Sequence, residues 1–179
     1  MSEEIKTLAS KTVYTNRWMT VREDSIERQS GHTGIYGVVE KADFAVIAAV
    51  QDGKIYLVEQ YRYPVAGRYW ELPQGSWESS TIAPLELAAA ELREETGLIA
   101  NDIRHVGHLF LAYGYSTQGY DIFFATELTQ SSAQIELEEH GLVTQAFTLG
   151  EVEKMMLNGE IKDATTVAAF GLLKLKGFV

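Results

Sequence analysis

Hydrophobic and polar positions alternate along the first quarter of the chain. The alternation is clearest from Met19 to Ile26, and the apolar run Ile35 to Val39 follows a turn that contains Gly31 and Gly34. A period of two residues is typical of strands that bury one face. We therefore expect two or three strands between residues 12 and 40.

The next segments predict a buried hairpin. Residues 44–50 are continuously apolar, as expected for a strand covered on both faces. The dipeptide Asp52-Gly53 is a strong hairpin turn signal, and residues 55–61 are expected to pair back. A loop that contains prolines and glycines should then extend from residue 64 to 75.

The strongest helical pattern begins at Pro84, which suits a first helical turn, and ends at Gly97, which suits a C-cap. Apolar side chains recur at helical spacing and are expected to face the core, with the carboxylates of the helix on another side: Leu85, Ala88, Ala89 and Leu92.

Strand patterns return after this helix, and helical patterns end the chain. We expect strands at 103–113, 120–127 and 143–148, then helices at 149–157 and 163–174, with Asp163 as N-cap of the last helix. This order predicts an α+β fold, a mixed β-sheet with helices on its faces.

Composition narrows the function classes. The chain has 179 residues, of which 46% are apolar, so one domain with a sizeable core is expected. We divide it into an N-terminal strand region, residues 1–42, and a main domain, residues 43–179. A net charge of −10 argues against nucleic-acid binding, because phosphate backbones require Lys and Arg. An acidic protein that handles phosphates needs a local counter-charge, and a divalent cation is the usual one.

Further classes are excluded by single features. The absence of cysteine excludes disulfides, thiolate metal sites and a Cys nucleophile. The N-terminus is acidic and lacks a signal-peptide pattern, and no apolar stretch reaches the roughly 18 residues that a membrane span needs. We expect a cytoplasmic protein. The four histidines lack zinc-site spacing, and neither a serine-hydrolase elbow nor a P-loop is present.

Three carboxylates carry the candidate chemistry. Glu91, Glu94 and Glu95 lie at i, i+3 and i+4, so a helix places them on one face. Their mutual repulsion is relieved by Mg²⁺ or Mn²⁺, which prefer carboxylate oxygens and accept phosphate oxygens as further ligands. Charge patterning alone favours the alternative of a solvated acidic surface.

The segment in front of the helix favours a metal site over a solvated acidic surface. Residues 70–75 read Trp-Glu-Leu-Pro-Gln-Gly, and here the chain resembles the Nudix hydrolase family. That family's box joins a glycine, a loop and a helix with Arg-Glu-(apolar)-x-Glu-Glu-x-Gly-(apolar). The matching positions are Gly75, Glu91, Leu92, Glu94, Glu95, Gly97 and Leu98.

Two positions depart from the box. Ala90 stands where the family has an arginine that braces the carboxylates. The family's loop glutamate is replaced by Thr81 or Ile82, depending on where one extra residue falls, and Glu78 in the same loop is a candidate substitute. Loss of such supporting groups typically costs about 10–100-fold in affinity or activity.

The resemblance covers nearly the whole chain. Residues 18–24, 59–64 and 159–166 are similar to segments of the family's ADP-ribose pyrophosphatase branch. The resemblance implies the Nudix fold, in which a mixed sheet is sandwiched between helices. It also implies a homodimer, because in that branch the N-terminal strands cross to a partner subunit.

The resemblance also implies roles in catalysis. Glu91, Glu94 and Glu95 would bind Mg²⁺ or Mn²⁺ together with the backbone carbonyl of Gln74. The general base would be a loop glutamate, Glu139 as first choice and Glu138 as second, with Glu94 as a competing candidate from the helix.

Other residues are implied to bind the substrate. Arg62 would contact phosphate, and Glu71 would help to hold the adenine or ribose end. Trp18 and Tyr63 could stack on a base, although such aromatic residues more often serve packing.

Two functions follow as hypotheses. The first is a hydrolase that cleaves the diphosphate of a nucleoside diphosphate sugar, with ADP-ribose as leading substrate, giving AMP and ribose 5-phosphate; GDP-mannose is a variant. The alternative, favoured by Ala90 and the missing loop glutamate, is a catalytically weakened Nudix-fold protein that binds and senses a nucleotide.

Overall fold

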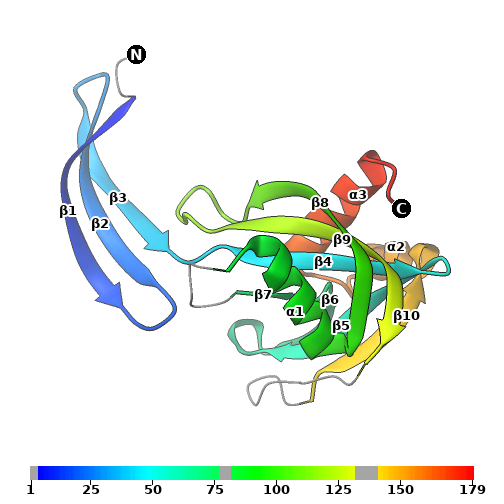
Figure 1. The fold of residues 1–179 in the computed structure, drawn as a ribbon. Helices are drawn as coiled ribbons and strands as arrows, with labels where there is room; N and C mark the ends of the chain where they lie inside the picture. Colours follow the sequence, from blue (N-terminus) through cyan, green and yellow to red (C-terminus); the bar gives the residue numbers. More distant parts are fainter. Residues whose placement is uncertain (1–3, 77–81, 132–140) are drawn as a thin grey trace. The chain divides into compact units, whose positions relative to one another are not determined.

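The computed structural model describes residues 4–76, 82–131 and 141–179 (Figure 1). The chain separates into two compact units. One consists of residues 1–43 and 110–120, and the other of residues 44–109 and 121–179. The sequence-based division at residue 42 stays a prediction.

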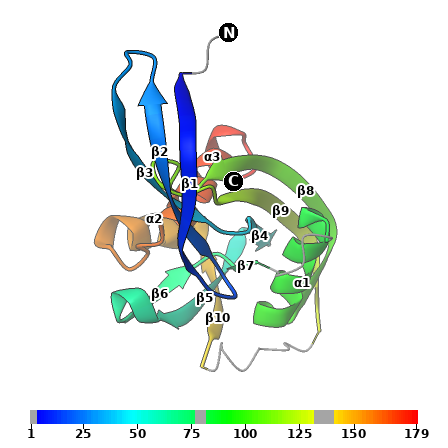
Figure 2. The ribbon, with the colours of Figure 1, turned by 90° about the vertical axis from the view of Figure 1, so that its left-hand side faces the viewer.

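The first unit is built on an antiparallel sheet of three strands in the order β1-β2-β3, namely β1 (Ile5–Thr15), β2 (Thr20–Arg28) and β3 (Thr33–Glu40) (Figure 2). The predicted N-terminal antiparallel strands are thus confirmed, and β1 starts earlier than the pattern indicated. Residues 110–120 join this unit through β3, where the Val39 amide donates to the Tyr115 carbonyl at 2.8 Å.

The second unit contains, within the described residues, a seven-stranded sheet. Its main order is β10-β5-β4-β9-β8, with β6 paired to β5 and β7 paired to β4. The strands are β4 (Phe44–Gln51), β5 (Lys54–Arg62), β6 (Gly67–Glu71), β7 (Gln74–Gly75), β8 (Leu98–Phe110), β9 (Gly119–Gln130) and β10 (Val143–Thr148).

Two of these strands were missed in the sequence. The segment 64–75, expected to be a loop, contains the short helix η1 (Tyr63–Val65) and the strands β6 and β7. Its prolines and glycines mark the breaks between these short elements. The predicted β4–β5 hairpin is confirmed. Asp52 and Gly53 both have positive φ, as a type I′ turn requires.

Helices pack around this sheet. They are α1 (Pro84–Thr96), α2 (Leu149–Asn158) and α3 (Ala164–Leu175). The predicted caps are present: Gly97 is left-handed at the end of α1, and the Asp163 carboxylate accepts the backbone N–H groups of Thr165 and Thr166. None of the helices in the described ranges is long and apolar enough to span a membrane.

The core lies against both faces of β4. Leu87, Ala88 and Leu92 of α1 pack with Ala45, Ile47 and Ala49 of β4 and with apolar residues of β9. Helix α3 also contacts β4, and Figures 1 and 2 show it on the other side of the sheet from α1. The predicted α+β class, with a mixed sheet between helices, is confirmed.

Two predictions about α1 were wrong. Leu85 was expected in the core, but it is 46% exposed, and Leu87 takes that place. The carboxylates were expected on another side of the helix, yet Glu91 and Glu95 are buried on the same side as Leu92. The reason is that both side chains meet the sheet that α1 covers: Glu95 accepts the Gln74 N–H, and Glu91 packs on Gly75.

Candidate active site

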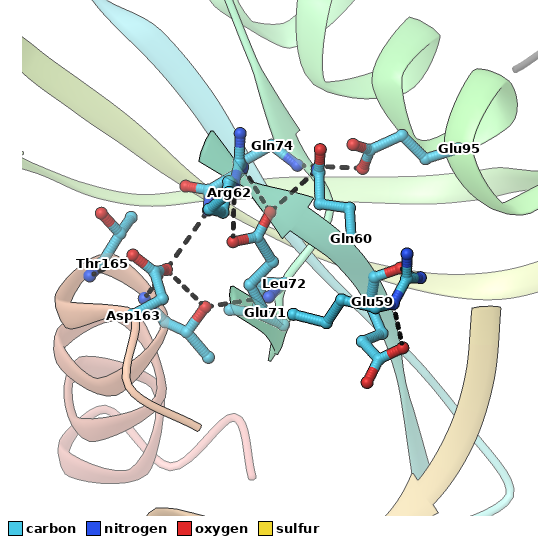
Figure 3. A network of polar contacts seen from close by, with 11 residues as sticks. Glu59, Gln60, Arg62, Glu71, Leu72, Gln74, Glu95, Asp163 and Thr165 are labelled. Carbon is cyan, nitrogen blue, oxygen red and sulfur yellow. Dashed lines mark hydrogen bonds and ion pairs between the residues drawn. The ribbon is translucent and has the colours of Figure 1, made fainter. Parts of the chain in front are cut away.

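Glu95 joins α1 to β7. Its side chain is 1% exposed, and one carboxylate oxygen accepts the backbone N–H of Gln74 at 3.1 Å (Figure 3). The helix itself is held at this point from β10, because the Thr144 hydroxyl donates to the Glu95 carbonyl at 2.9 Å. A buried carboxylate is thus fixed against the backbone of a two-residue strand.

Glu91 approaches the same strand one residue further on. A Cβ added to Gly75 would lie 2.3 Å from the Glu91 carboxyl carbon, closer than any real contact. Gly75 is needed here because it has no side chain, not because of its φ, which lies outside the left-handed region. The Glu91 side chain, from a residue only 7% exposed, therefore packs directly on the β7 backbone.

Glu94 lies beside this pair but is less enclosed. Its side chain is partly exposed, and its carboxylate is 3.8 Å from the Arg93 guanidinium. The structure thus brings Glu91 and Glu95 together at β7, with Glu94 next to them on the helix.

This arrangement fits a hard divalent cation. In residues 4–76, 82–131 and 141–179, no three acidic or histidine side chains are grouped closely enough to hold a metal alone. Mg²⁺ does not need such a cage, because it keeps several waters and is usually bound by one or two carboxylates plus substrate phosphates. Two carboxylates beside the β7 backbone provide that donor set. The assignment of all three glutamates and the Gln74 carbonyl stays a prediction.

A further buried carboxylate belongs to β6. Glu71 forms an ion pair with the Arg62 guanidinium through Nη2 and Nε, and the Gln60 amide donates to it at 2.9 Å (Figure 3). Burial raises the pKa of the Glu71 carboxyl, and Arg62 offsets this only in part. Burial acts to lower the pKa of Arg62, but Glu71, together with Glu95 and Asp163, outweighs burial and raises the pKa.

The exposures of the two partners differ. The Arg62 side chain is 41% exposed, whereas that of Glu71 is only 3% exposed. A guanidinium has five N–H donors in a planar fork, so a carboxylate on one edge leaves capacity for an anion. Arg62 is thus suited to contact phosphate, and Glu71 is suited to hold Arg62 in place.

Sequence reasoning missed a contact from α3. Asp163 was identified only as a helix cap, but it also accepts the side-chain amide of Gln74 at 3.2 Å. A residue 89 positions away in the chain gives no local signal of this contact. The only hint was that residues 159–166 resemble a family segment.

The other predicted site residues lie outside this group of contacts or outside the described residues. Trp18 lies in the first unit, is exposed and has the Arg17 guanidinium 5.7 Å from its ring centre. Tyr63 lies in η1 and is also exposed. Glu138, Glu139, Glu78 and Thr81 lie outside the described residues, so their predicted roles stay predictions.

Two family models match the chain. The model for the nucleoside diphosphate sugar hydrolase N-terminal domain matches residues 5–39, and that for the NUDIX domain matches residues 40–170. The second match spans most of the chain and contains the β7–α1 site.

Curated relatives and a solved structure agree with these matches. An ADP-ribose pyrophosphatase of Mycobacterium tuberculosis is 30% identical, covering 92% of this chain and 81% of the relative. One from Bacillus subtilis is 29% identical, covering 98% and 95%. The crystal structure of an ADP compounds hydrolase superposes with a TM-score of 0.86 at 22% identity, covering 99% and 98%, which shows the shared fold. The chain therefore belongs to the Nudix hydrolase family.

Proposed function

We propose that this protein is a metal-dependent hydrolase that cleaves the diphosphate of a nucleoside diphosphate sugar, with ADP-ribose as leading substrate and AMP and ribose 5-phosphate as products. The observation that carries the proposal is the convergence of Glu91 and Glu95 on β7, where Gly75 leaves room for a carboxylate. The names of the two relatives and of the N-terminal family model support the substrate class.

The carboxylates define the metal end of the site. Glu91 and Glu95, with Glu94 and the Gln74 carbonyl, would hold Mg²⁺ or Mn²⁺. When bound, such an ion neutralises charge on the diphosphate and lowers the pKa of a water molecule. Because Glu91 and Glu95 are buried, their carboxylate oxygens are held in place and need not rearrange when a cation binds.

Arg62 defines the phosphate end. Its guanidinium, held by Glu71 from one edge, would bind a phosphate oxygen with its remaining N–H groups. In this proposal Glu71 positions Arg62 rather than contacting the nucleoside, because its carboxylate is buried and already accepts from Arg62 and Gln60.

The proton acceptor comes from one of two places. Glu139, or else Glu138, would take the proton of the attacking water from a loop; Glu94 is the candidate on α1. The partly exposed Glu94 carboxylate supports the second option, because a general base must reach a water molecule. Single Gln variants of the three residues would separate the options by their pH–rate profiles.

The proposal includes a homodimer in the cytoplasm. Exposed apolar side chains on the first unit support the dimer, because association would remove them from water. They include Leu8, Val13, Tyr14, Trp18 and Ile35. A chain without cysteine does not depend on an oxidising compartment, which is compatible with a cytoplasmic location.

A substrate panel tests the proposed function. ADP-ribose, GDP-mannose, UDP-glucose and NADH would each be incubated with Mg²⁺ or Mn²⁺, and release of nucleoside monophosphate measured. We expect metal-dependent turnover, fastest for ADP-ribose. Turnover of none of the four, with nucleotide binding retained, would favour the sensor hypothesis, which rests on Ala90 in place of the bracing arginine.

A further inference from the structure

A buried hydroxyl at the start of α3 contacts the segment that leads into β7. Thr166 is 1% exposed, and its Oγ1 accepts the backbone N–H of Leu72 at 2.9 Å. The same hydroxyl donates to Asp163 Oδ2 at 2.7 Å. The hydroxyl therefore links a backbone donor on one side to a carboxylate on the other.

The same Asp163 oxygen holds the far end of the segment. Asp163 Oδ2 accepts the Gln74 side-chain amide at 3.2 Å as well as the Thr166 backbone N–H at 2.8 Å. Figure 3 shows these contacts meeting at the N-terminus of α3. Leu72 and Gln74, on either side of Pro73, are thus both tied to one carboxylate.

Other elements fix the segment from two further directions. The Pro73 carbonyl accepts the Ile47 N–H of β4 at 3.0 Å, and the Gln74 N–H donates to Glu95 of α1 at 3.1 Å. Residues 72–74 therefore have bonds to β4, α1 and α3. These bonds determine where the backbone of Gln74 and Gly75 lies against the Glu91 and Glu95 carboxylates.

We propose that Asp163 and Thr166 are positioning residues for the catalytic metal, acting through residues 72–74. The inference rests on the proposed function, since it concerns the same cation. Neither side chain contacts the ion. They fix the β7 backbone, so that its carbonyl and the two glutamates form one donor set.

The chain offers matched variants for a test. Thr166→Val keeps the shape and removes the hydroxyl, which breaks the link from Leu72 to Asp163. Thr166→Ser restores the hydroxyl. Thr165 lies in the same turn and is similarly buried, but it contributes its backbone N–H to Asp163, so Thr165→Val is the control.

Mn²⁺ binding to the nucleotide-free protein is the main readout, measured by calorimetry beside kcat, KM and urea unfolding. We expect Thr166→Val to weaken Mn²⁺ binding by about 10–100-fold, as loss of groups behind metal ligands does. Thr166→Ser and Thr165→Val should bind within about 3-fold of wild type, because the link remains. kcat of Thr166→Val should fall at saturating substrate and recover in part at high Mn²⁺.

A second variant covers the case in which Thr166→Val does not fold. Asparagine is as good an N-cap as aspartate, so Asp163→Asn keeps α3 while it removes the charge that receives the hydroxyl and the amide. It should weaken Mn²⁺ binding in the same way. Wild-type Mn²⁺ affinity in a folded Thr166→Val or Asp163→Asn protein would overturn this inference and leave the proposed function unaffected. A wild-type protein that neither binds Mn²⁺ nor turns over ADP-ribose would overturn the proposed function, and the inference with it.

Discussion

At the scale of single residues, the site depends on groups whose neighbours are distant in the sequence. Gly75 matters because the Glu91 carboxylate occupies the space of its missing side chain. Arg62 matters because Glu71 fixes one edge of its guanidinium. The first contact leads to a prediction about activity, and the second leads to a prediction about stability.

Gly75→Ala should abolish most activity without unfolding the protein. The added Cβ meets the Glu91 carboxylate, which is the far end of a flexible side chain and can swing away. We expect kcat/KM for ADP-ribose to fall by at least about 100-fold, while the urea midpoint changes little. Gly171→Ala is the control, because its Cβ meets nothing within 4 Å. Wild-type activity in Gly75→Ala would contradict the placement of Glu91.

Arg62→Met should destabilise the protein in a pH-dependent way. Burial already raises the pKa of Glu71 above 4.5, and loss of Arg62 removes the main effect that lowers it. When folding raises the pKa of a carboxyl group, its ionised form destabilises the folded state. The loss of unfolding free energy is therefore complete above the folded-state pKa of Glu71 and shrinks as the pH falls towards 4.5.

We therefore expect Arg62→Met to lose about 2 kcal/mol of unfolding free energy near neutral pH, less than for a fully buried pair because Arg62 is partly exposed. The loss should be smaller near pH 5. Urea unfolding at both pH values measures it. In the double variant with Glu71→Gln the pH dependence should disappear; an equal loss at both pH values in the single variant would refute the argument.

At the scale of elements, local signals predicted the helix ends and the β4–β5 turn, but not all strand bounds: the strand expected at 103–113 is β8 at Leu98–Phe110. Pro84, Gly97 and Asp163 mark helix ends because their backbone and side-chain chemistry acts within one turn. The Asp52-Gly53 turn is equally local. Such signals need no knowledge of the tertiary fold.

The buried side of α1 could not be predicted in this way. Periodicity places apolar residues inside and carboxylates outside, yet Glu91 and Glu95 are buried with Leu92. Glu95 accepts a backbone N–H of β7 and Glu91 packs on its glycine, and this strand is too short to show a pattern of its own. The contact of Thr166 with Leu72 is likewise tertiary, since 94 positions separate the two residues.

Gly171→Ala should stabilise α3. Gly171 lies in the helix interior with open space around its Cα, so alanine removes backbone entropy from the unfolded chain without a clash. We expect a gain of about 0.5–1 kcal/mol. The melting temperature should rise by roughly 2–3 °C, read by circular dichroism. A lower melting temperature would contradict the open space around Gly171.

At the scale of the whole molecule, the sequence predicted the α+β class and the family, because the box and the segments around it cover most of the chain. It could not predict that Asp163 and Thr166 contact residues 72–74 within the second unit, since those contacts depend on packing rather than on motifs. The proposed dimer belongs to this scale. It concerns the first unit, where every residue of β1 is exposed.

Light scattering tests the dimer directly. One chain has a mass of 19.9 kDa, and we expect the protein in solution to have about twice that mass, because association would cover the exposed apolar side chains of the first unit. Leu8→Glu should shift the mass towards the monomer if β1 forms the interface. A monomeric wild type would refute the dimer while leaving the β7–α1 site unaffected.

In the proposed mechanism, buried carboxylates of α1 would hold a cation that assists the attack of water on the diphosphate. The most direct test of this mechanism is kcat/KM for ADP-ribose with Mg²⁺, compared between Glu95→Gln and Glu86→Gln. Glu86 is an exposed glutamate in the first turn of the same helix, so its variant makes the same change in charge outside the site. We expect Glu95→Gln to lose at least about 100-fold and Glu86→Gln to stay within about 2-fold of wild type. A Glu95→Gln protein with wild-type kcat/KM, or equal losses in both variants, would contradict the account.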